Sequence, residues 1–154
     1  MDNARLSPED FRLLAEFRFQ IRQFLHFSES AARTLGIEPQ QHQLMLAIKG
    51  LPAQTRPTVR AISSRLCLRH NSTVELINRL ASRGALVRRP SEDDRREVMI
   101  ELTPFGEELL QQLSVLHIQE LQNAGPALAE ALQRILRSEQ PLQAERLKAA
   151  EAQA

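Results

Sequence analysis

Apolar residues recur at helical spacing along the first 36 residues of the chain. Ser7, Pro8 and an acid three residues after Ser7 form a typical helix start, and Gly36 forms a typical helix end. Residues 7–36 are therefore expected to form one helix, roughly 42 Å long at 1.5 Å per residue. A lobe of this size cannot cover so long an apolar stripe, and we expect the remainder to pack against a second subunit. The stripe consists of Phe11, Leu14, Phe17, Ile21, Phe24, Ser28, Ala31 and Leu35.

Three shorter helices follow, each with its own start signal. Pro39 is typical of the first turn of a helix, and Thr58 is a typical N-cap for the next one. Ser72 and Glu75 form a capping-box pattern, which predicts that the fourth helix starts there and runs to Gly84.

Two short stretches predict the strands of a β-hairpin after the fourth helix, and in the second one Val98, Ile100 and Leu102 alternate with the other residues. The stretches are Leu86–Pro90 and Glu97–Leu102. Residues 91–96 join them without the Asn-Gly or Asp-Gly of a tight turn, so we expect this loop to project from the hairpin.

The last third of the chain has a second helical pattern. Thr103 and Pro104 predict the start of a fifth helix. Gly125 and Pro126 predict a break, because proline cannot continue a helix without losing a hydrogen bond. Residues 128–136 then predict a sixth helix.

The order of these elements is that of a winged helix-turn-helix: a short helix, a tight connection, a capped helix and a hairpin. We therefore predict a mainly α fold with a small β-hairpin wing, in a single domain that spans residues 1–154. Residues 39–102 form the winged helix-turn-helix lobe, and residues 7–36 and 103–152 form N- and C-terminal dimerisation helices. The expected dimer contacts are Phe11, Leu14, Phe17, Ile21, Leu113, Leu116, Leu128, Leu132 and Ile135.

Charge is unevenly distributed, although the formal net charge is only +1. Between Arg56 and Ile100, ten arginines stand against five acidic residues. Arginine suits bidentate contacts with bases and phosphates, so this pattern favours a cationic nucleic-acid-binding surface. Ordinary solvated helix faces are the alternative interpretation.

Composition also limits the compartment and the chemistry. The single cysteine, Cys67, excludes an intramolecular disulfide, and neither a signal peptide nor a membrane span is indicated, so we expect a cytoplasmic protein. Cys67 is expected to pack as a small hydrophobe at the end of the third helix rather than to sense oxidants. The spacing of the four histidines does not suggest a metal site, and no pattern indicates an enzyme or a bound cofactor.

The fourth helix separates into two faces at 100° per residue. One face is apolar, and the other carries short polar side chains of the types that hydrogen-bond base edges in a major groove. The predicted DNA contacts on the polar face are Asn71, Ser72, Glu75, Asn78 and Arg79, with Ser82 on the same face. His70, next to this helix, is a candidate phosphate or base contact. A solvent-facing helix surface is the alternative.

The projecting loop of the hairpin carries Asp94, Arg95 and Arg96. An arginine at such a tip can enter the narrow, negative minor groove beside the site that the helix reads. Asp94 can hold that arginine in a productive rotamer. Arg88 and Arg89 are predicted to contact phosphates. A solvated run of charges is the alternative.

Two short motifs lie within residues 61–106. The first motif is Asp-Arg-Arg, followed by a strand, Leu-Thr and a Gly. It is matched by Asp94, Arg95, Arg96, Leu102, Thr103 and Gly106. The second motif follows the pattern Arg-Leu, three residues, Gly and then Leu or Val. It is matched at the end of the fourth helix by Arg79, Leu80, Gly84 and Leu86, with one extra residue, Ala85, before Leu86. With these motifs the segment resembles the DNA-binding lobe of MarR-type transcriptional regulators, and the order of helices across residues 7–137 fits that family.

The resemblance implies an obligate homodimer with interleaved N- and C-terminal helices. It also implies binding to pseudo-palindromic operators in double-stranded DNA and release by a small phenolic or anionic effector. We therefore expect a dimeric repressor. A winged-helix module that binds an acidic protein partner and has no operator of its own is the alternative. A ligand crevice formed by Phe19, Arg22, His26 and Phe27 is a further hypothesis, with core or interface packing as its alternative.

Overall fold

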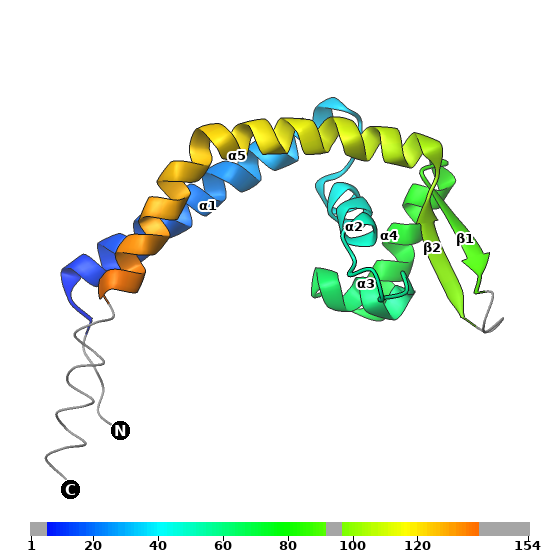
Figure 1. The fold of residues 1–154 in the computed structure, drawn as a ribbon, viewed down its shortest axis with the longest axis horizontal. Helices are drawn as coiled ribbons and strands as arrows, with labels where there is room; N and C mark the ends of the chain where they lie inside the picture. Colours follow the sequence, from blue (N-terminus) through cyan, green and yellow to red (C-terminus); the bar gives the residue numbers. More distant parts are fainter. Residues whose placement is uncertain (1–5, 92–96, 139–154) are drawn as a thin grey trace, which may run out of the picture. The chain divides into compact units, whose positions relative to one another are not determined.

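A computed structural model describes residues 6–91 and 97–138 of the chain. The described residues form five helices and one two-stranded antiparallel sheet (Figure 1). In chain order, the elements are α1 (Pro8–Thr34), α2 (Pro39–Lys49), α3 (Val59–Leu66), α4 (His70–Ser82), β1 (Leu86–Pro90), β2 (Val98–Leu102) and α5 (Pro104–Ser138). The predicted mainly α fold with a β-hairpin is therefore confirmed.

The chain divides into two compact units, and α1 and α5 each contribute to both. Residues 28–117 form the first unit, which we call the lobe; it contains α2, α3, α4 and the hairpin. Residues 1–27 and 118–154 form the second, which we call the two-helix unit. The core of the lobe consists of fully buried side chains, including Leu44, Met45, Ile62, Ile77, Leu80, Ile100 and Leu113.

The ends of α1 follow from local signals. The Asp10 N–H donates to Ser7 Oγ at 3.2 Å, and the Ser7 N–H donates to Asp10 Oδ2 at 2.8 Å. The hydrogen bonds that the side chain and the backbone of Ser7 donate hold the pKa of Asp10 below its ordinary value. After Thr34, Gly36 takes a φ of +69°, which side chains disfavour, and the helix ends. The predicted helix is confirmed at both ends.

The next two helices also start as predicted. Pro39 is the first residue of α2, where its missing N–H costs no hydrogen bond. Thr58 caps α3 by accepting a hydrogen bond from the Ala61 N–H at 3.3 Å.

The turn between α3 and α4 differs from the prediction. Cys67 ends α3 with a left-handed backbone (φ +52°), the conformation that glycine most often provides at a helix end. The turn is therefore shorter than predicted, and α4 begins at His70 with Arg69 as its N-cap. Ser72 lies in the first turn of α4, so the prediction that it caps this helix is wrong. Cys67 is exposed, and the prediction that it packs as a buried hydrophobe is also wrong.

The hairpin pairs as predicted, with Leu86 opposite Leu102 and the strands antiparallel. The pairing continues past the strand ends, because the Ser91 N–H donates to Glu97 O at 2.8 Å. The loop between them, residues 92–96, lies outside the described residues.

A third backbone segment ties the hairpin to the start of α3. The Ile100 N–H donates to Pro57 O at 2.8 Å, and Thr58 forms an antiparallel bridge with Met99. The residue that caps α3 is thus also paired with β2. This connection fixes the hairpin against the helix-turn-helix.

Four residues form a tight joint between the hairpin and α5, which we call the Thr103 joint: Gly84, Ala85, Thr103 and Gly106. The Thr103 N–H donates to Ala85 O at 3.1 Å, and its hydroxyl donates to Gly84 O at 2.6 Å. The same hydroxyl accepts from the Gly106 N–H at 3.1 Å, which caps α5. Gly106 lies so close to Ala85 that a Cβ atom on it would stand 2.1 Å from Ala85 O.

α5 continues through Gly125 and Pro126, where a break was predicted. An internal proline costs about 3 kcal/mol. The contacts of α5 nevertheless continue across the proline, with Leu113 buried before it and Ala131 buried after it. The predicted fifth and sixth helices are one helix, and the expected segment beyond Ser138 lies outside the described residues.

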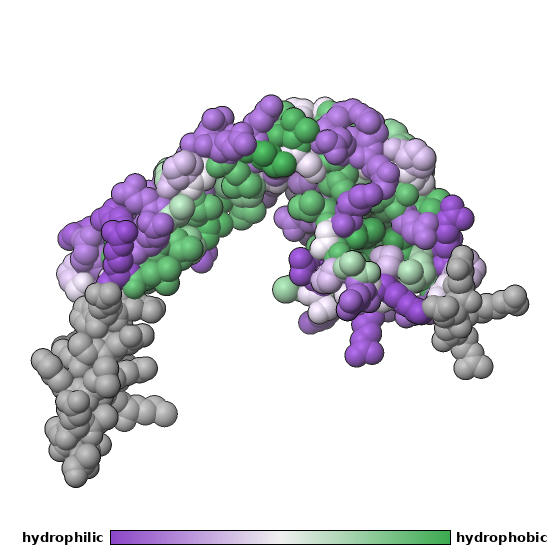
Figure 2. All heavy atoms as spheres, in the orientation of Figure 1, coloured by the Kyte–Doolittle hydropathy of each residue, from purple (hydrophilic) through white to green (hydrophobic). Residues whose placement is uncertain are grey.

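In the two-helix unit, the contact between α1 and α5 is small, and large apolar side chains of both helices are exposed. Leu13 and Ala131 are 7% and 4% exposed, and Arg134 Nη2 lies 3.6 Å from Glu9 Oε1. Figure 2 shows the apolar atoms gathered along these two helices. The exposed residues are Phe11, Leu14, Phe19 and Leu25 on α1, and Ile118, Leu121, Leu132 and Leu136 on α5. We call these eight side chains the apolar face. Within the described ranges, no helix is both long and apolar enough to cross a membrane.

The Thr103 joint gives a test of the fold. Gly106→Ala is expected to destabilise the chain by about 1–3 kcal/mol, because the new methyl group forces the backbone at Ala85 to move. Gly125→Ala is the matched control: no atom outside its own helix lies within 4 Å, and alanine favours a helix by about 0.5–1 kcal/mol. Urea unfolding measures both variants. A Gly106→Ala protein as stable as the wild type would contradict the close contact.

Candidate nucleic-acid interface

α4 buries one face in the lobe and exposes the other, as the sequence pattern predicts. Thr73, Leu76, Ile77 and Leu80 are buried on the inner face. The outer face consists of exposed polar side chains: Asn71, Ser72, Glu75, Asn78, Arg79 and Ser82. His70, the first residue of α4, is exposed as well. Every α4 residue predicted to contact DNA is therefore accessible.

The outer face of α4 offers both hydrogen-bond donors and acceptors. Arg79 Nη2 lies 3.8 Å from Glu75 Oε2, and the two side chains are 68% and 69% exposed. Such an exposed ion pair contributes little stability, so either group can leave it for another partner. Asn71, Ser72 and Asn78 can each donate and accept. This set of groups matches the chemistry of base edges in a major groove.

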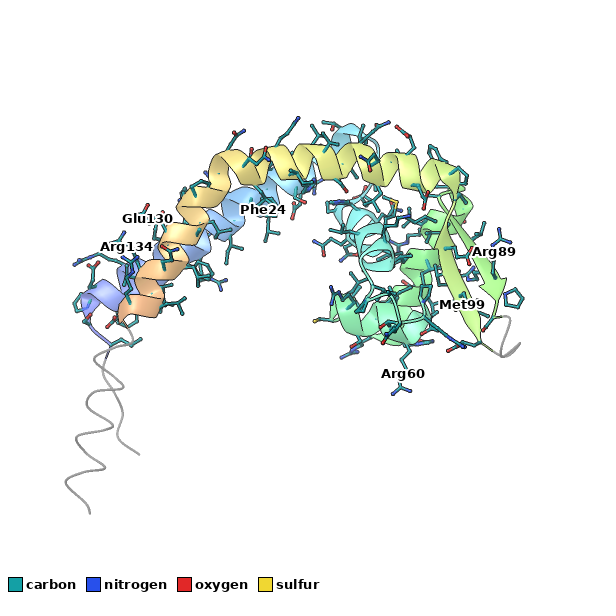
Figure 3. The ribbon with its side chains drawn as sticks, in the orientation of Figure 1. Phe24, Arg60, Arg89, Met99, Glu130 and Arg134 are labelled. Atoms are coloured by element: carbon teal, nitrogen blue, oxygen red, sulfur yellow. The ribbon has the colours of Figure 1, made fainter. Side chains whose placement is uncertain are left out.

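The two arginines of β1 have different partners. Arg88 Nη2 donates to Asn78 Oδ1 on α4. Arg89, which is labelled on β1 in Figure 3, donates from Nε to Glu101 Oε2 on β2 at 2.8 Å. The sequence pattern treated both as equivalent phosphate contacts. The structure joins Arg88 to the outer face of α4, whereas Arg89 pairs across the hairpin.

Arg56 contacts both ends of the wing loop, and the sequence analysis did not single it out. Its Nη1 donates to Glu97 Oε2 at 3.0 Å and lies 3.4 Å from Ser91 Oγ. Ser91 is 6% exposed, so this end of the loop is held inside the lobe. No local signal predicts a contact between residues 41 positions apart. The fold alone brings them together.

The tip of the wing carries the remaining predicted DNA contacts. Asp94, Arg95 and Arg96 lie outside the described residues. Their role in the minor groove stays a prediction. What the structure adds is the position of the two ends of the loop, Ser91 and Glu97, which their backbone hydrogen bond holds together.

The residues predicted to form dimer contacts differ in exposure. Leu113 is fully buried in the core of the lobe and has no surface to offer a second chain. Four others are exposed, at 60%, 41%, 38% and 42% for Phe11, Leu14, Leu116 and Leu132. The rest are half-buried: Phe17, Ile21, Leu128 and Ile135.

The predicted ligand crevice lies on the part of α1 that belongs to the two-helix unit. Phe19, Arg22 and His26 are exposed there, and Phe27 is half-buried. Their side chains are accessible to a ligand, and the crevice stays a prediction.

Two histidines that are distant in the sequence pack against each other inside the lobe. His42 is 3% exposed, and its ring centroid lies 4.6 Å from that of His117. His117 Nδ1 lies 2.6 Å from Leu113 O, and because a carbonyl only accepts, this nitrogen carries a proton. His117 Nε2 lies 2.7 Å from Ser28 Oγ. Burial, followed by the charge of His117, lowers the pKa of His42 to about 4.

The histidine pair is not part of a larger ligand set. Among the residues that the structure describes, no group of three or more His, Cys, Asp or Glu side chains could hold a metal ion. His42 Nδ1 is buried without a hydrogen-bond partner in the described structure. Protonation of His42 would therefore lower the stability of the folded chain, because it would place a charge in the core.

Comparisons with known proteins agree with this architecture. Residues 35–97 match the model of the MarR family. A curated protein of Thauera aromatica, named "Putative transcriptional regulatory protein for hcr operon", is 25% identical over 114 residues, which cover 74% of this chain and 67% of the relative.

Solved structures share the fold at low sequence identity. AbsC, a MarR family transcriptional regulator from Streptomyces coelicolor, has a TM-score of 0.71 at 17% identity, covering 96% of this chain and 99% of its own. A mutant of S. aureus MepR bound to an oligodeoxyribonucleotide has a TM-score of 0.60 at 18% identity, with coverages of 85% and 94%. Bordetella bronchiseptica BpsR, whose DNA binding is regulated by 6-hydroxynicotinic acid, has a TM-score of 0.59 at 20% identity, with coverages of 79% and 87%.

The succession of α3, α4 and the hairpin, with a polar face exposed on α4, defines a winged helix-turn-helix protein. Residues 35–97 match the MarR family model, and the chain as a whole is similar in fold to MarR family transcriptional regulators. The resemblance noted in the sequence is confirmed.

The buried histidine pair predicts a loss of stability at acid pH. The pKa of His42 is about 4 in the folded chain against an ordinary value of 6.5, so the unfolded chain takes up a proton first as the pH falls. The contribution of His42 to the free energy of unfolding is therefore fully present above about pH 6.5. It decreases by up to about 3 kcal/mol between pH 6.5 and pH 4.

Urea unfolding across this pH range measures the effect. His42→Leu is expected to remove this part of the pH dependence, whereas His26→Leu, which changes an exposed histidine, should keep it. A His42→Leu protein with the pH dependence of the wild type would contradict the assignment.

Proposed function

We propose that the chain is a dimeric repressor that binds a pseudo-palindromic operator in double-stranded DNA. The observation that carries this proposal is the exposed polar face of α4, with Arg88 bonded to its edge. An α-helix of this kind fits the major groove, which is about 12 Å wide. The proposed contacts are His70, Asn71, Ser72, Glu75, Asn78, Arg79, Arg88 and Arg89.

Charge and a related structure support DNA as the partner. The segment from Arg56 to Ile100 has ten arginines and five acidic residues, which favours attraction to a phosphate backbone. The MepR mutant that shares this fold is bound to an oligodeoxyribonucleotide. The same arrangement of α3, α4 and hairpin would place α4 of this chain in the groove.

The wing extends the proposed contact to the flanking minor groove. Arg95 and Arg96 can enter a narrow groove, where the negative potential is strongest, and Asp94 can hold the inserted arginine. The contacts of Arg56 with Ser91 and Glu97 support this role, because they give the ends of the loop a fixed place beside α3.

A second copy of the chain is the proposed partner for the apolar face. Eight large apolar side chains exposed on two neighbouring helices are more than a soluble monomer usually presents. A twofold axis buries the same face of both copies and presents two α4 helices to two half-sites. In this proposal, residues 7–36 and 103–152 form the dimerisation helices, and residues 39–102 form the winged helix-turn-helix.

Release by a small phenolic or anionic effector completes the proposal. BpsR, which shares the fold, has its DNA binding regulated by 6-hydroxynicotinic acid, an aromatic acid. Phe19 and Phe27 offer aromatic surface, and Arg22 and His26 offer hydrogen-bond donors, so these four residues are the proposed effector site.

Binding titrations at several salt concentrations test the DNA partner. With an operator selected from a random DNA pool, the slope of log affinity against log salt is expected to be about −6 to −10, because both subunits release counterions from phosphates. A scrambled duplex of the same length serves as the control and should bind at least about 1,000-fold more weakly. A shallow slope, with equal affinity for both duplexes, would instead indicate a module that binds an acidic protein.

Phe11→Glu tests the dimer. Phe11 is 60% exposed on the apolar face, and two buried copies per dimer should make this change raise the dissociation constant at least about 100-fold. Phe105→Glu is the matched control: Phe105 is 51% exposed but lies in the lobe, so this variant should remain dimeric. Sedimentation equilibrium at micromolar concentration measures both. A wild-type chain that is folded and monomeric would refute the dimer.

A further inference from the structure

The hydrogen bond between β1 and α4 points to a specific role for Arg88 in base recognition. We propose that Arg88 is a positioning residue that turns the amide of Asn78 so that this side chain selects guanine and rejects adenine. This inference rests on the proposed DNA-binding function. It deepens that function by assigning the base that one position of α4 reads.

The chemistry of the contact fixes the orientation of the amide. A guanidinium group has only donors, so the atom of Asn78 that Arg88 Nη2 contacts must be the oxygen, Oδ1. The nitrogen Nδ2 then occupies the other branch of the amide, directed away from Arg88. Asn78 is exposed on the outer face of α4, so this nitrogen is available to a ligand.

An asparagine held in this way reads adenine poorly, although Oδ1 keeps a second lone pair. Recognition of adenine uses both ends of the amide, with Nδ2 donating to N7 and Oδ1 accepting from the N6 amino group. In this chain, the guanidinium of Arg88 already lies against Oδ1, and its positive charge repels the partly positive amino hydrogens of adenine. The same argument rejects cytosine, whose N4 amino group is also a donor.

Guanine fits the remaining donors. Its major-groove edge carries two acceptors, N7 and O6, and no donor. Nδ2 of Asn78 can supply one hydrogen bond to this edge.

The neighbouring arginine provides an internal comparison. Successive side chains of a strand point to opposite faces, so Arg88 and Arg89 face different surroundings. Arg89 donates to Glu101 across the hairpin and does not contact an α4 residue in any described hydrogen bond. A change at Arg89 therefore alters the charge of the hairpin without changing the orientation of Asn78.

Selection of bound sites from a random DNA pool tests the proposal with the full-length chain. The operator position read by Asn78 is identified as the position whose preference disappears in Asn78→Ala. The wild type should select guanine there. Arg88→Ala should lower the preference for guanine over adenine at that position by about five- to 150-fold, with the other positions unchanged.

Two control variants separate positioning from simple loss of charge. Arg88→Lys keeps a donor for Oδ1 and should retain guanine. Arg89→Ala removes the same charge from the next residue and should weaken all sequences alike, with the selected motif unchanged. Circular dichroism melting of each variant checks that it is folded.

Several outcomes would overturn the proposal. The wild type could select adenine at the Asn78 position, or Asn78→Ala could leave the motif intact. Arg88→Ala could also weaken all sequences alike, which would make Arg88 a phosphate contact. A wild-type pool without any enriched sequence would overturn the proposed function itself, and the inference with it. A pool with a clear motif that Arg88→Ala does not alter overturns only the inference.

Discussion

Burial of the inner face of α4 is the constraint on which the candidate DNA-binding surface depends. Ile77 and Leu80 are fully buried in the lobe, and no rotation of α4 could expose them without loss of about 1.5–3 kcal/mol for each. The opposite face must therefore point outward. Because the hairpin is tied to α3 through Pro57 and is joined to α4 through Arg88, the wing and the helix present their side chains as one surface.

Local signals account for the elements that the sequence predicts correctly. The starts of α1, α2 and α3 each depend on residues within three or four positions, as at Ser7 and Thr58. The start of α4 was missed because Cys67, a residue that rarely adopts a left-handed backbone, takes the place of glycine in the turn. The prediction of a break at Pro126 was wrong because a local helix-breaking signal does not show the contacts that α5 makes on both sides of the proline, at Leu113 and Ala131.

The candidate site also has a part that local sequence predicts and a part that depends on tertiary contacts. The outer face of α4 is predictable, since burial of every third or fourth residue leaves the other positions exposed. The partner of each side chain is not, because Arg56 reaches Glu97, and Arg88 reaches Asn78, only once the hairpin has folded against the helices. The buried contact between His42 and His117 likewise depends on tertiary structure.

The Thr103 joint illustrates why similarity to MarR-type regulators indicates the fold but not the operator sequence. Thr103 and Gly106 carry part of the family motif, and here they hold the backbone of the hairpin to α5 at a distance that only glycine permits. Neither residue belongs to the outer face of α4. Two relatives can therefore share this motif and its geometry and still recognise unrelated operators. In the proposed function, the choice of operator depends on the few exposed side chains of α4 and on the wing, and sequence identity of 15–20% to solved structures carries no information about these positions.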